Sequence, residues 1–192
     1  MKGRKWNIQA AWPVQLLIAL VLVFVLPLVS AAVEVGQKAP DFALRSTTGG
    51  KIRLSDFAGK KNVLIEFYVM DFYPGCEEAH QTRRDAYEKF QARDTEVLGI
   101  SAFSPYAQQA FAKTLDLPYP LLSDFPHLKT IKKYDVEQKI GSIPTAKRAY
   151  FIVDKQGIVR FKRIVSPFDV DGPYLQNDVL FSELEKINKT RE

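Results

Sequence analysis

The ten residues Phe67–Cys76, FYVMDFYPGC, connect an apolar strand pattern to a helix pattern and contain the only cysteine of the 192-residue chain. Pro74 and Gly75 mark a turn between the two patterns. The free N–H groups and the dipole of a helix N-terminus favour a negative charge, and the thiolate is the reactive form of cysteine. A lone cysteine is often only a small buried apolar residue. The strand–turn–helix context favours a reactive thiolate at Cys76 over that alternative.

The residues on both sides of this stretch have the patterns of regular secondary structure. Residues 62–69 form a nearly continuous apolar run, which is typical of a strand buried on both faces. After the cysteine, apolar residues recur at helical spacing and predict one helix from about residue 75 to 92. Residues 96–101 predict a second strand of the buried type.

The rest of the chain alternates between strand and helix patterns. Residues 41–44 and 51–54 predict an N-terminal β-hairpin, and Ser104-Pro105 predicts the start of a helix. The other predicted elements are a helical turn at 55–59, a strand at 121–122, a helix carrying Phe125, Leu128 and Ile131, a loop at 136–147, strands at 148–154 and 158–165, and a last helix at 178–189. This order predicts an α/β fold with a mixed sheet and helices on both of its faces.

Residues 1–32 differ in composition from the remainder of the chain. Three basic residues, Lys2, Arg4 and Lys5, precede an apolar run over 16–29, and small residues at 30–32 follow it. This layout is typical of a secretory signal peptide. The run is shorter than the roughly 20 residues of a bilayer span, although counting from Trp12 reaches that length. We expect residues 1–32 to be a signal peptide or an N-terminal membrane anchor. Residues 33–192 would then be one exported domain, periplasmic or otherwise extracytoplasmic.

The charge distribution does not indicate a nucleic-acid-binding protein. The formal net charge is +5, from 27 basic and 22 acidic residues. Three of the basic residues and none of the acidic ones lie in 1–32, so 24 against 22 remain and the expected domain carries +2. Lys129, Lys132 and Lys133 form a small basic cluster, which is more often a solvated helix face than a binding patch.

Several motifs together resemble a known family. Residues 39–42 (APDF), 54–60 (LSDFAGK) and 72–76 (FYPGC) are similar to motifs of the peroxiredoxins, the AhpC/TSA superfamily, and most similar to its bacterioferritin-comigratory or PrxQ-like branch. The similarity continues in order to 148–154 and covers roughly residues 35 to 165. The resemblance implies a thioredoxin-like, three-layer α/β/α fold with a mixed central sheet and an N-terminal β-hairpin.

In peroxiredoxins a cysteine attacks the terminal oxygen of a hydroperoxide and becomes a sulfenic acid. The family motif, Pro-x-x-x-Thr/Ser-x-x-Cys, is completed by an arginine just before a late strand. The resemblance therefore implies Cys76 as the nucleophile and Arg148 as that arginine. A fixed cation stabilises the thiolate and the charge that moves onto the leaving oxygen, and a guanidinium can bind two oxygens at once. The alternative for Arg148 is a surface arginine at a strand end.

The chain departs from the family pattern close to the cysteine. Val69 stands where the motif has proline, Tyr73 stands where it has threonine or serine, and Ala79 stands where closer relatives have glutamate. The phenol of Tyr73 reaches further than the hydroxyl it replaces. It would either donate its O–H from another angle or line the pocket with its ring. We assign Tyr73 to the catalytic site, with Cys76 and Arg148, because of its position in the motif.

The single cysteine also limits the partners that the reaction needs. The chain can form no internal disulfide and has no resolving thiol, so an external thiol must reduce a sulfenic acid at Cys76. Glutathione, a thioredoxin-like protein or a second copy of this protein, which would be a monomer or a homodimer, fits that requirement. The expected function is an exported thiol peroxidase that reduces hydrogen peroxide or organic hydroperoxides and uses no cofactor.

Two other functions compete with this one. The first is a thioredoxin-fold protein without peroxidase activity that binds a partner or a metal. His80 lies one helical turn after Cys76, and a Cys-His pair can activate a thiol or bind a soft metal. We expect His80 instead to be a partly exposed helix residue. The second, thiol–disulfide exchange, is disfavoured because the chain has no Cys-x-x-Cys motif.

Overall fold

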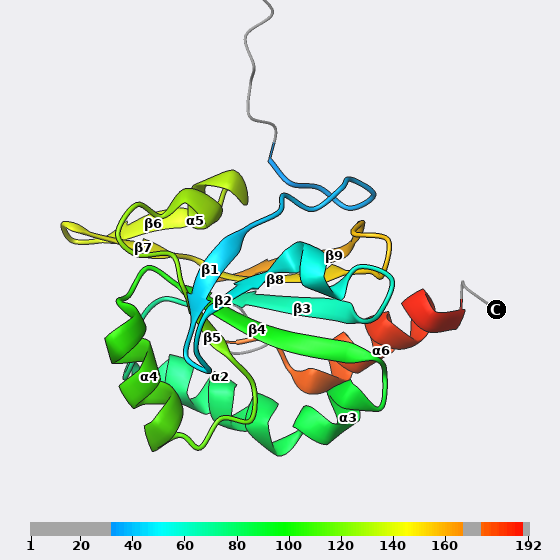
Figure 1. Cartoon of the computed structure of the whole chain (residues 1–192), viewed down its shortest axis with the longest axis horizontal. Coiled ribbons are helices and arrows are strands. Elements are labelled where there is room, and N and C mark those ends of the chain that lie inside the picture. The colour runs from blue at the N-terminus through cyan, green and yellow to red at the C-terminus, as the bar shows by residue number, and fades with distance from the viewer. Residues whose placement is uncertain (1–31, 167–173, 190–192) are drawn as a thin grey trace, which may run out of the picture. The chain divides into compact units, whose positions relative to one another are not determined.

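The computed structural model describes residues 32–166 and 174–189, which form a seven-stranded mixed sheet with helices packed against it (Figure 1). The strand order is β2-β1-β5-β4-β3-β8-β9. The strands of this sheet are β1 (Ala43–Ser46), β2 (Lys51–Arg53), β3 (Asn62–Phe67), β4 (Thr95–Ser101), β5 (Leu121–Ser123), β8 (Arg148–Val153) and β9 (Val159–Val165). The helices are the 3-10 helix η1 (Leu54–Phe57), α2 (Pro74–Asp85), α3 (Tyr87–Gln91), α4 (Pro105–Thr114), α5 (Lys129–Lys133) and α6 (Asn177–Lys189).

Strand β3 lies at the centre of the sheet. It pairs in parallel with β4 and antiparallel with β8, and all six of its residues are buried. The continuous apolar run predicts this, because a strand covered on both faces needs apolar side chains in both directions. Successive side chains point to opposite faces of the sheet. Ile65 and Phe67 accordingly pack in one hydrophobic core and Leu64 packs in the other.

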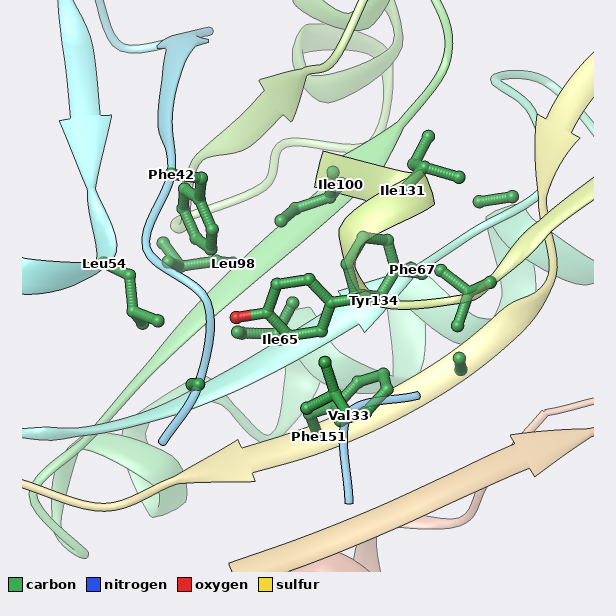
Figure 2. Close-up of a cluster of buried hydrophobic side chains, with 14 of the residues drawn as sticks. Val33, Phe42, Leu54, Ile65, Phe67, Leu98, Ile100, Ile131, Tyr134 and Phe151 are labelled. Carbon is green, nitrogen blue, oxygen red and sulfur yellow. The ribbon is translucent and has the colours of Figure 1, made fainter. Parts of the chain in front are cut away.

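Each face of the sheet is covered by its own core. On the first face, the N-terminal segment, η1 and α5 pack against the strands, and Figure 2 shows Val33, Leu54 and Tyr134 among the side chains of this core. The second core contains side chains of α2, α3, α4 and α6, including Cys76 and Phe111. The predicted mixed sheet with helices on both faces is therefore confirmed, and the cysteine lies on the more helical side.

Several local signals in the sequence form the expected structures. The β1–β2 hairpin pairs Ala43 with Arg53 in an antiparallel register. The side chain of Ser104 caps α4 by accepting a hydrogen bond from the N–H of Ala107 at 3.3 Å. Strands β8 and β9 are joined by a turn in which Gly157 has a φ of 79°, which favours glycine.

The single helix predicted over residues 75–92 is wrong, because the chain forms two helices there. The break lies at Ala86, whose φ of −109° and ψ of 7° are not helical. The change of direction lets Tyr87 donate its hydroxyl to Glu96 on β4 at 2.7 Å and lets Phe90 pack on Phe181 of α6. The apolar spacing continues through the break, so the pattern alone does not reveal it.

The region 125–147 also differs from the prediction. Helix α5 begins only at Lys129, and Phe125 lies outside it with an exposed side chain. A residue before proline is disfavoured in helical backbone, and Pro126 follows Phe125 directly. The predicted loop contains a separate antiparallel pair, β6 (Glu137–Ile140) and β7 (Ile143–Ala146), with Gly141 at the turn. These strands are short and half-exposed, so they lack the apolar run that identifies a buried strand.

Residues 1–31 of the predicted leader lie outside the described residues. In the part of the chain that the structure describes, none of the helices has the length and apolar character needed to cross a bilayer. Whether residues 1–32 are a signal peptide or an anchor remains a prediction from the sequence.

Candidate active site

Cys76 lies in the first turn of α2, directly after the turn that follows β3. Tyr73 is the N-cap residue of this helix and has an extended backbone, and proline occupies a position in the first turn where its missing N–H is not needed. The carbonyl of Tyr73 accepts hydrogen bonds from the N–H groups of Cys76 at 2.7 Å and Glu77 at 2.9 Å. The thiol therefore sits at the helix start that the sequence predicts, and only 1% of the residue is exposed.

Arg148 approaches the thiol from the sheet. It is the first residue of β8, and its Nη2 donates to the Sγ of Cys76 at 3.9 Å, a long contact that sulfur allows. The fold thus brings together two residues that are 72 positions apart in the sequence. Arg148 is 7% exposed, so it is not the surface arginine of the alternative interpretation.

The ring of Tyr73 lies against the guanidinium of Arg148. The Cζ of Arg148 is 5.5 Å from the centroid of that ring, a distance typical of a cation–π contact worth about 0.5 to 2 kcal/mol. Tyr73 is 44% exposed and Arg148 is 7% exposed, so the ring of Tyr73 lies between the guanidinium and the solvent. Of the two roles considered for Tyr73, the structure favours the ring as a wall.

The charge of Arg148 has no anionic partner among the residues that the structure describes. Among residues 32–166 and 174–189, no carboxylate pairs with its guanidinium, and its Nε is buried without a hydrogen-bond acceptor. A buried cation without a partner is unfavourable because it has lost its water. The arrangement therefore stabilises a negative charge on Cys76 or on an oxygen bound beside it.

Gly75 provides the clearance that this contact needs. A Cβ added at residue 75 would stand 2.8 Å from the Nη2 of Arg148, closer than a Cβ normally comes to another heavy atom. In the sequence this glycine indicates only a turn. Its role in admitting the guanidinium follows from the tertiary structure, because Arg148 comes from a distant strand.

His80 is fully buried, so the expectation of a partly exposed helix residue is wrong. It belongs to the same buried face of α2 as Cys76. Its Nδ1 lies 2.9 Å from the hydroxyl of Tyr119, and that hydroxyl lies 3.1 Å from the His80 carbonyl. Burial, the largest cause, lowers the pKa of His80 to about 4. In the described ranges no three His, Cys, Asp or Glu side chains are grouped as a metal site.

Comparisons with known proteins place this chain in a family. The model of the AhpC/TSA family matches residues 35–162. Alkyl hydroperoxide reductase E of Mycobacterium tuberculosis is 34% identical over 148 residues, which are 77% of this chain and 95% of that protein. The chain belongs to the AhpC/TSA family. The resemblance to peroxiredoxins is confirmed.

Two further relatives agree with this assignment. Chloroplastic peroxiredoxin Q of Populus jackii is 40% identical over 131 residues, which are 68% of this chain and 60% of that protein. The chain thus spans less than two thirds of the length of that relative. The crystal structure of the peroxidoxin BcpB from Mycobacterium tuberculosis has a TM-score of 0.71 and 27% identity and covers 81% of this chain and 98% of its own. The thioredoxin-like fold is therefore confirmed as well.

The departures from the AhpC/TSA pattern lie before and within the first turns of α2. Val69 and Ala79 are both buried, so each fills space in the core rather than contacting solvent.

Asp71, in the segment between β3 and α2, is also buried, and one of its oxygens accepts a hydrogen bond from the hydroxyl of Tyr68 at 2.8 Å. Burial raises the pKa of Asp71 to about 6. Phe72 has a φ of 58°, a left-handed conformation that costs a non-glycine residue about 1 to 3 kcal/mol.

Replacing Gly75 by alanine is expected to slow the reaction of Cys76 without weakening the fold. Alanine is the better helix former by about 1 kcal/mol, while its Cβ displaces the guanidinium from Sγ. We expect the melting temperature to be unchanged or higher and the rate of Cys76 oxidation by hydrogen peroxide to fall several-fold. An unchanged oxidation rate in Gly75→Ala would show that the contact is not needed.

The low pKa of His80 predicts a specific dependence of stability on pH. The unfolded chain protonates this histidine below about pH 6.5, whereas the folded chain keeps it neutral to about pH 4. Falling pH therefore favours unfolding across this window. We expect the unfolding free energy of the wild type, relative to His80→Phe, to fall from pH 6.5 to 4 and to stay constant above pH 6.5. Urea titrations at several pH values measure this difference, and a flat difference contradicts the assignment.

Proposed function

We propose that the protein is an exported thiol peroxidase in which Cys76 reduces a hydroperoxide and an external thiol regenerates Cys76. The observation that carries this proposal is the buried guanidinium of Arg148, which lies 3.9 Å from Sγ and has no carboxylate partner in the described part of the chain. Membership of the AhpC/TSA family and the similarity to an alkyl hydroperoxide reductase support the reaction class.

The first step transfers one oxygen atom to sulfur. The thiolate of Cys76 attacks the terminal oxygen of the hydroperoxide, the S–O bond forms and the O–O bond breaks. The proton of the hydroperoxide remains with the sulfenic acid, and the leaving oxygen departs as an alkoxide or hydroxide that takes a proton from water. Sulfur is oxidised and the peroxide is reduced to an alcohol or water. Arg148 stabilises the negative charge first on sulfur and then on the leaving oxygen.

The second step needs a reductant from outside the chain. One thiolate attacks the sulfur of the sulfenic acid and forms a mixed disulfide with Cys76, and the S–O bond breaks to release hydroxide, which takes a proton from the solvent. A second thiol then attacks that disulfide, which restores the Cys76 thiol and leaves the reductant oxidised. Cys76 is the only cysteine, so two glutathione molecules or one dithiol protein of the thioredoxin kind can supply both sulfurs, whereas a second copy of this protein supplies one and a further external thiol must supply the other. Because Cys76 is only 1% exposed, the residues around it must move before a protein thiol can reach it.

The location of the enzyme outside the cytoplasm is part of the proposal and rests on residues 1–32. The basic start, the apolar run and the small residues after it support export through a signal peptide or an anchor. Intact-mass analysis of the exported protein distinguishes the two forms. Loss of the residues up to about Ala32 indicates cleavage, and their retention indicates an anchor.

Substitutions of Arg148 should slow the oxidation of Cys76 in a graded way. Arg148→Lys keeps a charge but loses the planar fork, so we expect a moderate loss. Arg148→Ala loses the charge too, and removal of one such donor typically costs a factor of 100 to 1000, or about 3 kcal/mol. Cys76→Ser should abolish the reaction, because a serine hydroxyl is not ionised near neutral pH. The measurement is the single-turnover rate of Cys76 oxidation by hydrogen peroxide.

Arg45→Ala is the matched control for this series. Arg45 also lies over a tyrosine ring, that of Tyr106 at 5.9 Å, but it is exposed on β1 and does not contact Cys76. Its removal should leave the oxidation rate unchanged. If Arg148→Ala reacts as fast as the wild type, then the reactivity of the thiol has another cause and Arg148 is not a catalytic residue.

A further inference from the structure

Helix α2 is attached to the sheet through polar side chains to an unusual extent. Its buried residues, Cys76, Ala79, His80 and Arg83, recur at helical spacing and form one face. Two of these four are polar, and one of them is an arginine with no exposed surface. Arg83 lies seven residues, about two helical turns, after Cys76, so both side chains face the sheet. The placement of the thiol therefore depends on what Arg83 contacts.

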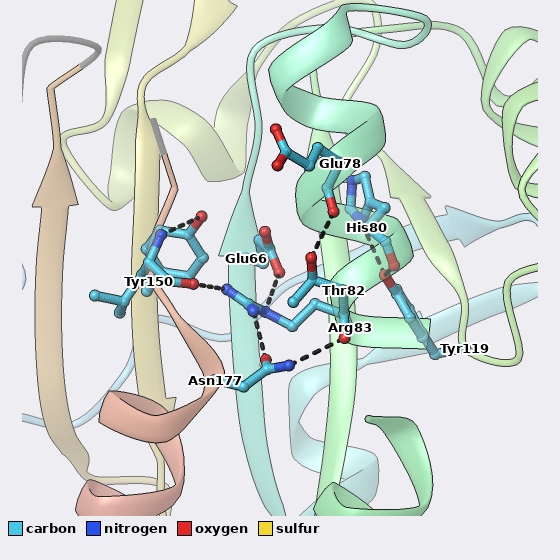
Figure 3. A network of polar contacts seen from close by, with 9 residues as sticks. Glu66, Glu78, His80, Thr82, Arg83, Tyr119, Tyr150 and Asn177 are labelled. Carbon is cyan, nitrogen blue, oxygen red and sulfur yellow. Dashed lines mark hydrogen bonds and ion pairs between the residues drawn. The ribbon is translucent and has the colours of Figure 1, made fainter. Parts of the chain in front are cut away.

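Arg83 contacts two separate parts of the fold with directed hydrogen bonds. Its Nε donates to a carboxylate oxygen of Glu66 on β3 at 3.1 Å, and this ion pair is almost completely buried. Its two terminal nitrogens donate to the side-chain oxygen of Asn177 and to the carbonyl of Leu175. Asn177 in turn donates to the carbonyl of Thr82 at 3.0 Å. Figure 3 shows this network between α2, β3 and the start of α6.

The same guanidinium also contacts the strand that carries Arg148. The Cζ of Arg83 is 5.5 Å from the ring centroid of Tyr150, and Tyr150 is the register partner of Glu66. Tyr150 follows Arg148 by two residues on β8, so both side chains point to the same face of the sheet. Helix α2 and strand β8 therefore meet at two points, Cys76 with Arg148 and Arg83 with Tyr150.

We propose that Arg83, through its ion pair with Glu66, is a positioning residue that sets the distance between the Cys76 sulfur and the Arg148 guanidinium. A shift of α2 by one residue moves its side chains by 1.5 Å and turns them by 100°. Such a shift would break the bonds of Arg83 and leave the carboxylate of Glu66 buried without its cation. The network therefore allows one register of the helix on the sheet, and that register places Sγ beside Arg148.

An apolar pair at these positions would bury the same space without fixing the register. Hydrophobic contact has no preferred direction, whereas each bond of Arg83 has one. Replacing a buried ion pair by apolar residues of similar size is often neutral or stabilising. The double substitution Arg83→Met with Glu66→Leu therefore separates positioning from stability, because the fold is expected to survive it. The kinetic part of this inference rests on the proposed peroxidase function.

The first test compares this double variant in two backgrounds. With Arg148 present, we expect Cys76 oxidation by hydrogen peroxide to slow about ten-fold, because an error of about 1 Å at a reacting centre costs up to a factor of 100. In the Arg148→Ala background, the same double substitution should change the rate less than two-fold. The double variant Arg93→Met with Glu185→Leu is the control, since that pair also combines a guanidinium, a carboxylate and an aromatic ring but lies on the surface.

The second test does not require peroxidase activity. The rates at which iodoacetate, an anion, and neutral iodoacetamide alkylate Cys76 are measured, and their ratio reports how close the Arg148 charge lies to the sulfur. We expect the Arg83→Met/Glu66→Leu variant to shift this ratio toward that of Arg148→Ala. A general loosening of the fold would raise both alkylation rates and leave the ratio unchanged.

The outcomes separate the two proposals. The positioning role is wrong if the double variant keeps both the wild-type rate of Cys76 oxidation and the wild-type alkylation ratio. It is also wrong if the double substitution slows Cys76 oxidation equally with Arg148 present and in the Arg148→Ala background. If hydrogen peroxide oxidises Cys76 of the wild type no faster than it oxidises free cysteine, the proposed function is wrong. The alkylation ratio then tests the positioning role by itself. If the double variant does not fold, Arg83→Lys replaces it, and its ratio should lie between the wild type and Arg148→Ala.

Discussion

The positive charge of Arg148, buried beside Cys76 and without a carboxylate partner in the described part of the chain, is the constraint on which the rest of the site depends. A guanidinium held away from water and from any carboxylate of the described chain is stable only if the surrounding fold fixes it and leaves room for an anion. Three features meet this condition. Strand β8 presents the arginine, the N-terminus of α2 presents the thiol, and Gly75 leaves the space between them.

The remainder of the fold keeps these two elements in register. Strand β3 lies between β4 and β8 and carries Glu66, whose ion pair with Arg83 attaches α2 to the sheet. On the outer side, the ring of Tyr73 covers the guanidinium where peroxiredoxins have a small hydroxyl residue. The fold thus brings together Cys76 and Arg148, the two residues that the family motif predicts, and surrounds them with packing by Tyr73 and Arg83 that the motif does not predict.

The sequence predicts much of the fold and the pair at its centre, but not the packing around it. The apolar run of β3 and the Ser104-Pro105 cap are local signals, and the family motif identifies Cys76 and Arg148. The break at Ala86 is not visible, because apolar spacing is the same on both sides of it. The burial of His80 and Arg83 depends on partners such as Tyr119 and Glu66, which are distant in the sequence. Periodicity shows which face of a helix is buried, but a polar residue on that face indicates exposure until its partner is known.

We propose that this arrangement makes Cys76 an unusually fast reductant of peroxides. Stopped-flow mixing of the wild-type protein with one equivalent of hydrogen peroxide, followed by mass spectrometry of Cys76, measures the rate at which one oxygen atom is added. We predict a rate constant at least 100-fold above that of free cysteine at the same pH, from the contribution of one preorganised donor. A rate constant equal to that of free cysteine would contradict the claim and favour a thioredoxin-fold protein that binds a partner or a metal.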